Sequence, residues 1–330
     1  MHALEGKVAL VAGATRGAGR AIACALGEAG ATVYVTGRSV RGASAMEGRP
    51  ESIEETAELI QRRGGRAHWV QVDHTQESEV EALCARIGHE QEGLDVLVDG
   101  VWGGDALTQW GVPFWELSMS QGRQLFQRAV ESHWITCRHA TPLLLARGSG
   151  LLVEVTDGDA LFYRGNLFYD LAKTSVIRLA YAMAQELRSS AVTALAVTPG
   201  MLRSEAVLAH FGVDEEHWRD AIEQDPHFAH SESPALLARG IVALACDPQV
   251  RERAGRVWAS WTLAREYGLE DADGRRPDWG AHIRATGEEL MQRGAPYDPL
   301  ERMILEQHAS RGDFDPEWAQ DAARIRALLD

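Results

Sequence analysis

A glycine-rich turn between a buried strand and a helix constrains the fold more than any other feature of this chain. The run KVALVAG, Lys7 to Gly13, is short, apolar and β-branched, which is typical of a buried strand. It continues as Gly13-Ala-Thr-Arg-Gly17-Ala-Gly19 and then as RAIACALGEAGA, which has helical periodicity. Glycines at such a turn let the backbone approach a pyrophosphate, and the helix N-terminus offers free N–H groups. We therefore expect a nucleotide-binding strand–turn–helix unit at the start of the chain.

The order of elements predicts the rest of the fold. Apolar runs predict strands at about 7–12, 32–36, 67–72, 94–99, 150–156 and 192–198, and GRVWASW (255–261) predicts a seventh. Helical stretches alternate with these strands; Ser52 with Glu55 fits a capping box, and Ser233-Pro234 opens another helix. Such alternation predicts an α/β fold with a doubly wound parallel seven-stranded sheet.

The end of the second predicted strand indicates which nucleotide binds. NAD sites usually end this strand with an acidic residue, whereas NADP sites accommodate the 2′-phosphate with arginine. Here ATVYVTGR ends in Thr36-Gly37-Arg38 without a carboxylate, and Arg16 lies inside the glycine turn. Two guanidinium groups suit a phosphate because their donors match its oxygens. We expect NADP(H); the alternative is that Arg38 is a solvated surface charge.

Tyr169 and Lys173 lie one helical turn apart in the amphipathic run YDLAKTSVIRLAYAMAQEL. Residues i and i+4 share a helix face, and a lysine beside a phenol favours phenolate. We therefore expect Lys173 to lower the pKa of Tyr169 from about 10 toward a range in which tyrosine transfers protons. Taken alone, this spacing also fits an exposed helix pair.

These motifs together resemble the short-chain dehydrogenase/reductase family. The glycine turn, Asp73 after the third strand, Tyr169-x-x-x-Lys173 and Pro199-Gly200 have that family's order and spacing over about residues 4–270. The resemblance implies a Rossmann-type sheet, a nicotinamide cofactor and carbonyl–alcohol interconversion. The cofactor contacts that it implies are Gly13, Thr15, Arg16, Gly17, Ala18, Gly19, Arg38, Asp73, Gly100, Tyr169, Lys173, Pro199, Gly200 and Ser204.

Departures from the family pattern fall on the catalytic residues. The family usually has a serine about a dozen residues before the tyrosine; here Asp157 takes that position, and Thr156 is the adjacent hydroxyl. Thr156 would supply a hydrogen-bond donor. Asp157 would disfavour a phenolate if ionised, donate a hydrogen bond if protonated, or act as a base. Ala129 replaces the asparagine of the family's proton relay, and Asp99-Gly100 replaces an Asn-Asn pair.

Aromatic residues after the fourth and fifth predicted strands favour a medium-sized apolar or aromatic substrate. Open α/β sheets bind ligands at the carboxyl ends of their strands, and aromatic side chains there would line a cleft. The substrate contacts that we expect are Trp102, Phe162 and Tyr163; packing in the core or an oligomer interface is the alternative. The segment MLRSEAVLAHFGVDEEHWRDAIEQ is expected to form a lid.

Bulk properties restrict partners and location. A net charge of −15 argues against nucleic acid and anionic membranes, and no apolar stretch reaches spanning length. The segment MHALEGK lacks a signal-peptide core. Single cysteines at 24, 84, 137 and 246 are expected to be small core residues in a reducing cytoplasm. No H-E-x-x-H motif occurs, and we expect no metal site.

The length of 330 residues fits one large unit, which we divide into a catalytic domain (1–270) and a C-terminal extension (271–330) acting as cap or oligomer arm. The resemblance also implies a homodimer or homotetramer built on the helices containing 121–146 and 169–189.

Three functions remain open from the sequence. The first is an NADP(H)-dependent oxidoreductase with Tyr169 as acid/base, Lys173 as its support, and Thr156 or Asp157 as the carbonyl partner. The second is a non-redox dehydratase, isomerase or cyclase that uses Asp157. The third is a catalytically silent nucleotide-binding or scaffold protein.

Overall fold

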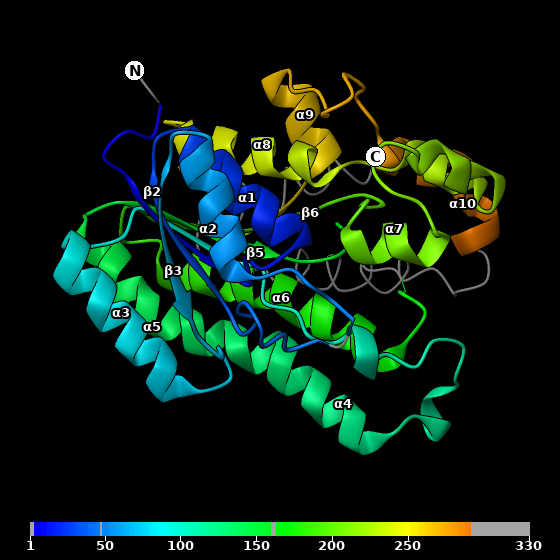
Figure 1. Ribbon diagram of the computed structural model, residues 1–330, viewed down its shortest axis with the longest axis horizontal. Coiled ribbons are helices and arrows are strands. Elements are labelled where there is room, and N and C mark those ends of the chain that lie inside the picture. The colour runs from blue at the N-terminus through cyan, green and yellow to red at the C-terminus, as the bar shows by residue number, and fades with distance from the viewer. Residues whose placement is uncertain (1–2, 47, 160–162, 292–330) are drawn as a thin grey trace, which may run out of the picture.

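A computed structural model describes residues 3–46, 48–159 and 163–291. Within these residues, seven parallel strands form one central sheet in the order β3-β2-β1-β4-β5-β6-β7 (Figure 1). The strands are β1 (Val8–Ala12), β2 (Thr32–Gly37), β3 (Arg66–Gln71), β4 (Val96–Asp99), β5 (Gly150–Val155), β6 (Val192–Thr198) and β7 (Val257–Ala259). The predicted α/β fold with a doubly wound parallel sheet is therefore confirmed.

The seventh strand is shorter than GRVWASW predicts. Only Val257–Ala259 pairs with β6, and Ser260 already begins helix α9 (Ser260–Tyr267). The Ser260 hydroxyl donates to the buried carboxylate of Glu232, so the chain turns away from the sheet at this point. The apolar pattern of the sequence does not reveal this contact. The strand prediction for 255–261 is therefore wrong at both ends, because the strand begins at Val257 and ends at Ala259.

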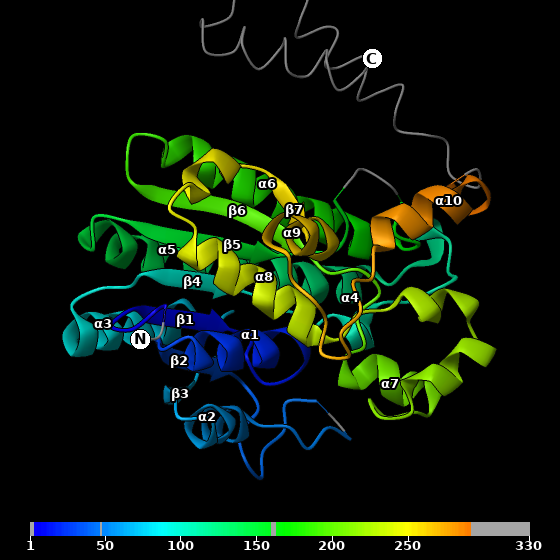
Figure 2. The same cartoon turned by 90° about the horizontal axis from the view of Figure 1, so that it is seen from above.

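Helices cover both faces of the sheet (Figure 2). Helices α1 (Gly17–Glu28), α2 (Ile53–Arg62), α8 (Pro234–Cys246) and α9 share one apolar core, in which Ile22 and Ile241 are fully buried. Helices α3 (Glu77–Gln91), α5 (Ser132–Ala146) and α6 (Leu167–Glu186) share the other. Alternate strand residues face opposite layers, for example Val11 and Leu10. Burial on both faces explains why inner strands such as β1 and β6 are continuously apolar, whereas the edge strand β3 has no buried residue.

Most of the remaining elements lie near the carboxyl ends of the strands; η6 (Val250–Arg253) instead precedes β7 at their amino ends, where Arg251 donates to the carbonyl of Arg188. Helix α4 (Met119–Phe126) follows β4 and joins α5 through a π-helical turn (Gln127–Glu131). Helices α7 (Glu205–Phe211) and α10 (Trp279–Met291) both lie at the right of Figure 1, and Figure 2 shows them apart. Short 3-10 helices are η1 (Asp105–Leu107), η2 (Phe114–Glu116), η4 (Trp218–Glu223), η5 (Pro226–His230) and η6 (Val250–Arg253).

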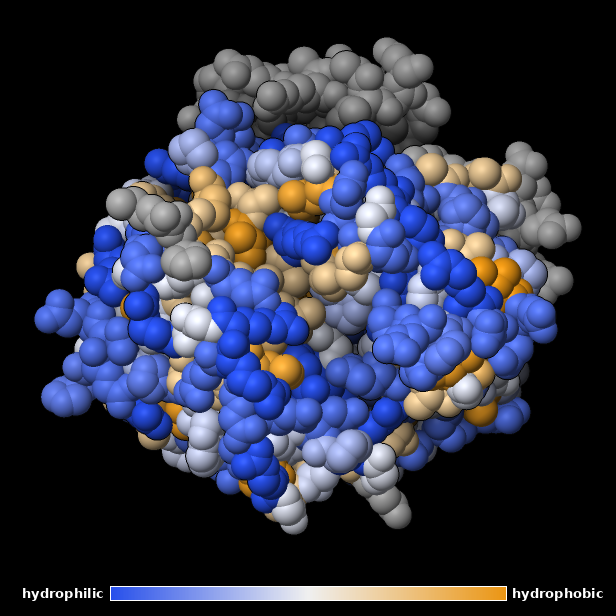
Figure 3. All heavy atoms as spheres, turned by 45° about the horizontal axis from the view of Figure 1, so that its top comes forward, coloured by the Kyte–Doolittle hydropathy of each residue, from blue (hydrophilic) through white to orange (hydrophobic). Residues whose placement is uncertain are grey.

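The face of the molecule drawn in Figure 3 is largely hydrophilic, and three of the four cysteines are buried. Hydrophobic residues form only scattered groups on the largely hydrophilic face drawn in Figure 3. Among the described helices, none is long and apolar enough to cross a bilayer. Cys24, Cys84 and Cys137 are buried as expected, but Cys246 is exposed because it ends α8. The expectation that all four are core residues is wrong for that position.

Candidate functional site

A pocket of about 450 Å³ opens at the carboxyl ends of the central strands. It brings together residues from the glycine turn, the end of β2, the loop after β4, β5 and α6, which are far apart in the sequence. Of the residues expected from the sequence, it is lined by Gly13, Thr15, Arg16, Ala18, Gly19, Arg38, Asp73, Gly100, Trp102, Thr156, Asp157, Tyr169, Lys173, Pro199, Gly200 and Ser204.

The glycine turn has the close backbone contacts that a nucleotide pocket of this kind needs. Gly13 has a φ of +78°, and a Cβ on it would lie 2.8 Å from the carbonyl oxygen of Gly100. A Cβ on Gly19 would lie 2.2 Å from the carbonyl oxygen of Gly13. Side chains at these positions would push α1 away from β1 and close the space beside the turn. The turn therefore fits a dinucleotide.

A carboxylate from the segment predicted to form a lid already contacts this turn. Glu205, the first residue of α7, accepts a hydrogen bond of 2.7 Å from the backbone N–H of Gly17. Gly17 begins α1, where free N–H groups and the helix dipole favour anions. The contact supports the anion-binding character of the turn, and it implies that Glu205 competes with any phosphate for the same donor.

The two arginines expected to bind a 2′-phosphate both have acidic neighbours. Arg16 donates from Nε to Glu51 at 3.2 Å, while its buried Nη2 has no partner among the described residues. Arg38 lies 4.0 Å from the carboxylate of Asp73. The unpaired Nη2 leaves a donor for one more anion. Because buried donors are rarely left unpaired, this atom fits a phosphate-bearing nucleotide.

Asp157, rather than Thr156, meets the catalytic tyrosine. The phenol of Tyr169 donates to Asp157 Oδ2 at 2.8 Å. The Thr156 hydroxyl instead donates to the backbone carbonyl of Lys173 at 2.9 Å and fixes β5 to α6. The side chain that faces the phenol is therefore a carboxylate, which in its ionised form only accepts hydrogen bonds.

The pKa of Tyr169 is raised above its usual value of about 10, chiefly by burial and then by the charge and hydrogen bond of Asp157. The expectation that Lys173 lowers this pKa is therefore wrong. The lysine side chain lies over aromatic rings, with Nζ 4.1 Å from the Trp102 centroid and 5.5 Å from that of Tyr169. Its own pKa is lowered by burial, an effect that Asp157 and Asp105 oppose.

Aromatic rings surround the phenol. Trp102 packs edge-on against Tyr169 at 5.3 Å between centroids, and Trp110 packs at 5.1 Å. The Trp102 indole donates to Asp105 at 2.6 Å. Tyr163 is 55% exposed, and Phe162 lies outside the described residues. Sequence reasoning missed Trp110, because its loop position gives no periodic signal.

Arg164 is a second residue that the sequence did not indicate. Its side chain is nearly fully buried; Nε donates to the backbone carbonyl of Asp157 at 2.6 Å, and Nη1 pairs with Asp170 at 2.8 Å. These contacts fix the loop after β5 against the first turn of α6. Arg164 therefore holds Asp157 in reach of Tyr169.

Ala129 supplies no polar group to this site. It is 1% exposed in the π-helical turn and packs in an apolar cluster with Leu125 and Ala172. Position 129 therefore cannot hold the proton relay that an asparagine holds in the family pattern.

A buried polar cluster lies directly behind the pocket wall. His133 on α5 contacts Glu154 on β5 through Nδ1, and its Nε2 lies 2.9 Å from the carbonyl oxygen of Val101. Asp99 accepts from the Val101 N–H at 3.1 Å, and its Oδ1 lies 3.6 Å from His133 Nδ1. Burial alone would lower the pKa of His133, but the two carboxylates outweigh burial and raise it to about 9.

The donor atoms of Asp99, His133 and Glu154 lie within 4.8 Å of one another, close enough to suit a metal ion. The three residues come from different elements with no ligand spacing in the sequence, so sequence reasoning missed them. In this structure the ring nitrogen of His133 contacts Glu154 directly, which makes the cluster a hydrogen-bonded brace for the Val101–Trp102 segment.

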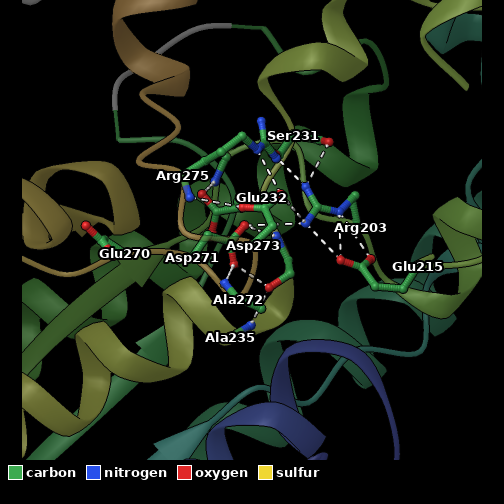
Figure 4. Close-up of polar contacts among 12 residues, drawn as sticks. Arg203, Glu215, Ser231, Glu232, Ala235, Glu270, Asp271, Ala272, Asp273 and Arg275 are labelled. Carbon is green, nitrogen blue, oxygen red and sulfur yellow. Dashed lines mark hydrogen bonds and ion pairs between the residues drawn. The ribbon is translucent and has the colours of Figure 1, made fainter. Parts of the chain in front are cut away.

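A second polar cluster anchors the segment after β6 (Figure 4). Gly200 N donates to Glu232 at 3.1 Å, and the fully buried Arg203 pairs with Glu215 at 2.8 Å and with Asp271 at 3.4 Å. Arg203 also donates to the Ser231 carbonyl at 2.8 Å. Residues that follow α9 thus hold the base of the predicted lid.

Ser204 and Trp279 complete this wall. Ser204 caps α7 by accepting from the Val207 N–H at 3.3 Å, so its side chain has a structural partner as well as a place in the pocket. A Cβ on Gly200 would lie 2.6 Å from Trp279 Cβ, so α10 packs closely on the Pro199–Gly200 turn.

Comparisons with known protein sequences identify relatives of this chain. The family model for short chain dehydrogenase matches residues 7–211. The chain is 36% identical to mouse (Mus musculus) dehydrogenase/reductase SDR family member 1 over 277 residues, which are 82% of this chain and 85% of that protein. The human (Homo sapiens) protein of the same name is 34% identical over 276 residues, with the same shares.

Solved structures show the same fold. A short-chain dehydrogenase/reductase from Burkholderia xenovorans superposes with a TM-score of 0.66 at 23% identity, covering 80% of this chain and 99% of that one. A hydroxysteroid dehydrogenase from Escherichia coli gives 0.62 at 22% identity, covering 78% and 95%.

The family expected from the motifs is confirmed, as is the likeness to member 1 that the segments GATVYVTGR and LAREYGLEDADGR suggest. With its glycine turn, its Tyr169–Lys173 pair and these matches, the chain belongs to the short-chain dehydrogenase/reductase family.

Proposed function

We propose that this protein is an NADP(H)-dependent oxidoreductase that interconverts a carbonyl and an alcohol on a medium-sized apolar or aromatic molecule. The observation that carries the proposal is the position of the Tyr169 phenol in the same pocket as the glycine turn. When bound, the nicotinamide would supply or accept the hydride at the substrate carbon.

Several residues of this chain would bind the cofactor. The glycine turn and the N-terminus of α1 would hold the pyrophosphate. Arg16 and Arg38 would pair with the 2′-phosphate, which the lack of an acidic residue at the end of β2 supports. Lys173 would bind the ribose, and Asp73 the adenine side of the pocket.

Tyr169 would transfer the proton at the substrate oxygen, and when the substrate is absent the phenol would keep that proton and donate to Asp157. The hydrogen bond between them supports this exchange. Trp102 and Trp110 would form the apolar wall on which an aromatic substrate rests, since both rings pack on the phenol.

The same hydrogen bond favours a second candidate, a non-redox dehydratase, isomerase or cyclase in which Asp157 is the acid or base. A turnover assay separates the two. NADPH consumption with a panel of aromatic ketones, abolished in a Tyr169→Phe variant, would support the oxidoreductase. Product formation without any change in NADPH absorbance would support the second candidate, and cofactor binding without turnover would indicate a silent binding protein.

We also propose a homodimer or homotetramer built on α5 and α6. Trp134 on α5 and Leu171 on α6 are 51% and 44% exposed, so each helix presents a large apolar side chain that a second copy would cover. Light scattering after size-exclusion chromatography tests this, and a monomer at micromolar concentration would contradict it.

A further inference from the structure

The carboxylate beside Tyr169 restricts which substrate group the site can hold. In a site built for a carbonyl, two hydroxyl groups donate to the same oxygen, which can only accept. Here Asp157 stands in one of those positions and itself accepts from the phenol at 2.8 Å. As a carboxylate it would face the lone pairs of a carbonyl oxygen and repel the negative charge that develops on it. A ketone therefore leaves Asp157 without a partner.

A nitrogen substrate would give Asp157 a donor in both oxidation states. A protonated imine carries an N–H, and so does the amine formed when it is reduced, whereas a ketone carries no donor at all. We propose that this site interconverts a carbon–nitrogen double bond and the corresponding amine, with Asp157 accepting a hydrogen bond from the substrate nitrogen. This further activity rests on the proposed oxidoreductase function for its hydride.

The charges around the phenol support a cationic nitrogen. Asp157 and Asp105 both act electrostatically on Tyr169 and on Lys173. Arg164 acts on the same two groups with the opposite sign and pairs with Asp170 at 2.8 Å. The carboxylates of Asp105, Asp157 and Asp170 thus outnumber the two cations by one, and the net negative charge favours a cationic ligand.

The aromatic wall supports the same class. Trp102 and Trp110 pack on the phenol at 5.3 and 5.1 Å, and Trp102 already has the Lys173 ammonium 4.1 Å from its ring centroid. Faces of tryptophan attract cations. Because Lys173 already occupies a face of Trp102, the aromatic body of an iminium or ammonium ligand would pack on the Trp110 ring, which is 58% exposed, while its nitrogen contacts Asp157.

The step balances without further reactants. In reduction, the C=N π bond breaks and its electron pair goes to nitrogen. One C–H bond forms with the hydride of the reduced nicotinamide, which is oxidised. A protonated imine keeps its proton on nitrogen throughout and donates it as a hydrogen bond to Asp157. A neutral imine takes one proton from Tyr169, which regains it from solvent through Asp157.

Two bicyclic probes of matched size test the proposal: dihydroisoquinoline, a cyclic imine, and α-tetralone, a ketone. With NADPH, the native protein is expected to reduce the imine at least ~10-fold faster than the ketone, and Asp157→Ser is expected to reverse this preference. A tenfold change in rate corresponds to about 1.4 kcal/mol, which one hydrogen bond to a charged group can supply. A native preference for α-tetralone that Asp157→Ser leaves unchanged would overturn the proposal while leaving the oxidoreductase function standing.

A binding measurement needs no turnover. Calorimetric titration with tetrahydroisoquinolinium is expected to show about 10-fold weaker binding to Asp157→Ser and Asp157→Asn than to the native protein. Glu81→Gln removes an exposed carboxylate on α3 that does not line the pocket, and is expected to change nothing. Equal affinity in all four proteins would overturn the inference. Asp157-dependent binding without NADPH-linked reduction of either probe would support nitrogen recognition and count against the redox function.

Discussion

At the residue scale, the Tyr169–Asp157 hydrogen bond is the feature that sets this site apart. The sequence places Lys173 one turn from Tyr169, and from that spacing a lowered tyrosine pKa follows. Spacing does not reveal burial or the carboxylate that the loop after β5 brings to the phenol, and these two causes raise the pKa instead. Sequence reasoning could name Asp157 and Thr156 as alternatives, but only the fold shows which one reaches the phenol.

Asp157→Asn is expected to lower the pKa of Tyr169, because it removes the charge that opposes phenolate while leaving burial in place. The ultraviolet difference spectrum followed against pH measures this ionisation, and Tyr169→Phe identifies its contribution. In the native protein, phenolate at this position should form at higher pH than in the variant. Identical titrations of the two proteins would show that Asp157 does not act on the phenol.

Glu205→Ala is expected to strengthen nucleotide binding. The Glu205 carboxylate occupies the Gly17 N–H at 2.7 Å, and its removal frees an anion-binding donor at a helix N-terminus. Such interactions contribute about 1 kcal/mol, so NADPH should bind roughly five-fold more tightly. Glu216→Ala, an exposed carboxylate outside α7, serves as the control. Weaker binding to Glu205→Ala would mean that Glu205 helps rather than competes.

At the element scale, the inner strands were predictable because parallel strands buried on both faces read as continuous apolar runs; the edge strand β3 has no buried residue. Clusters that join separate elements were not predictable. Asp99, His133 and Glu154 come from β4, α5 and β5, and no local pattern links them. Helix boundaries set by local capping, such as Ser52 at the start of α2, could be read directly, since Ser52 accepts from the Glu55 N–H.

His133→Gln is expected to destabilise the protein in a pH-dependent way. The folded pKa of about 9 exceeds the usual 6.5, so His133 stabilises fully below pH 6.5 and loses this contribution as pH rises through 9. Losing a buried partner costs about 3 kcal/mol. The Tm difference from the native protein should be largest near pH 6 and shrink by pH 9.5. His139→Gln, on the same helix, is the control; a difference that grows with pH would contradict this account.

At the scale of the whole molecule, residues beyond α9 belong to the structural support of the site. Asp271 pairs with the buried Arg203 at 3.4 Å and also accepts from Ser233 N at 2.8 Å. The guanidinium groups of Arg203, Arg219 and Arg275 lie 4.4, 4.5 and 4.5 Å from the Trp218 ring. The segment LAREYGLEDADGR thus connects the sheet to the base of the lid, which its composition alone did not indicate.

Arg203→Leu is expected to lower the free energy of unfolding by about 3–5 kcal/mol, because it leaves Asp271 buried without its cation. Arg219→Leu removes a guanidinium from the same tryptophan ring but at a side chain that is 59% exposed, and should cost less than about 1 kcal/mol. Chemical denaturation measures both. Equal losses would show that the buried ion pair does not anchor the lid.

The most direct test of the account is a tryptophan-fluorescence titration of the protein with NADPH and, separately, with NADH. Ten tryptophans provide the signal, and no substrate needs to be known. The account predicts saturable NADPH binding, with NADH at least ~10-fold weaker because it lacks the phosphate that Arg16 and Arg38 would bind. Equal affinities would contradict the assignment of these arginines, and no binding of either nucleotide would contradict the oxidoreductase itself.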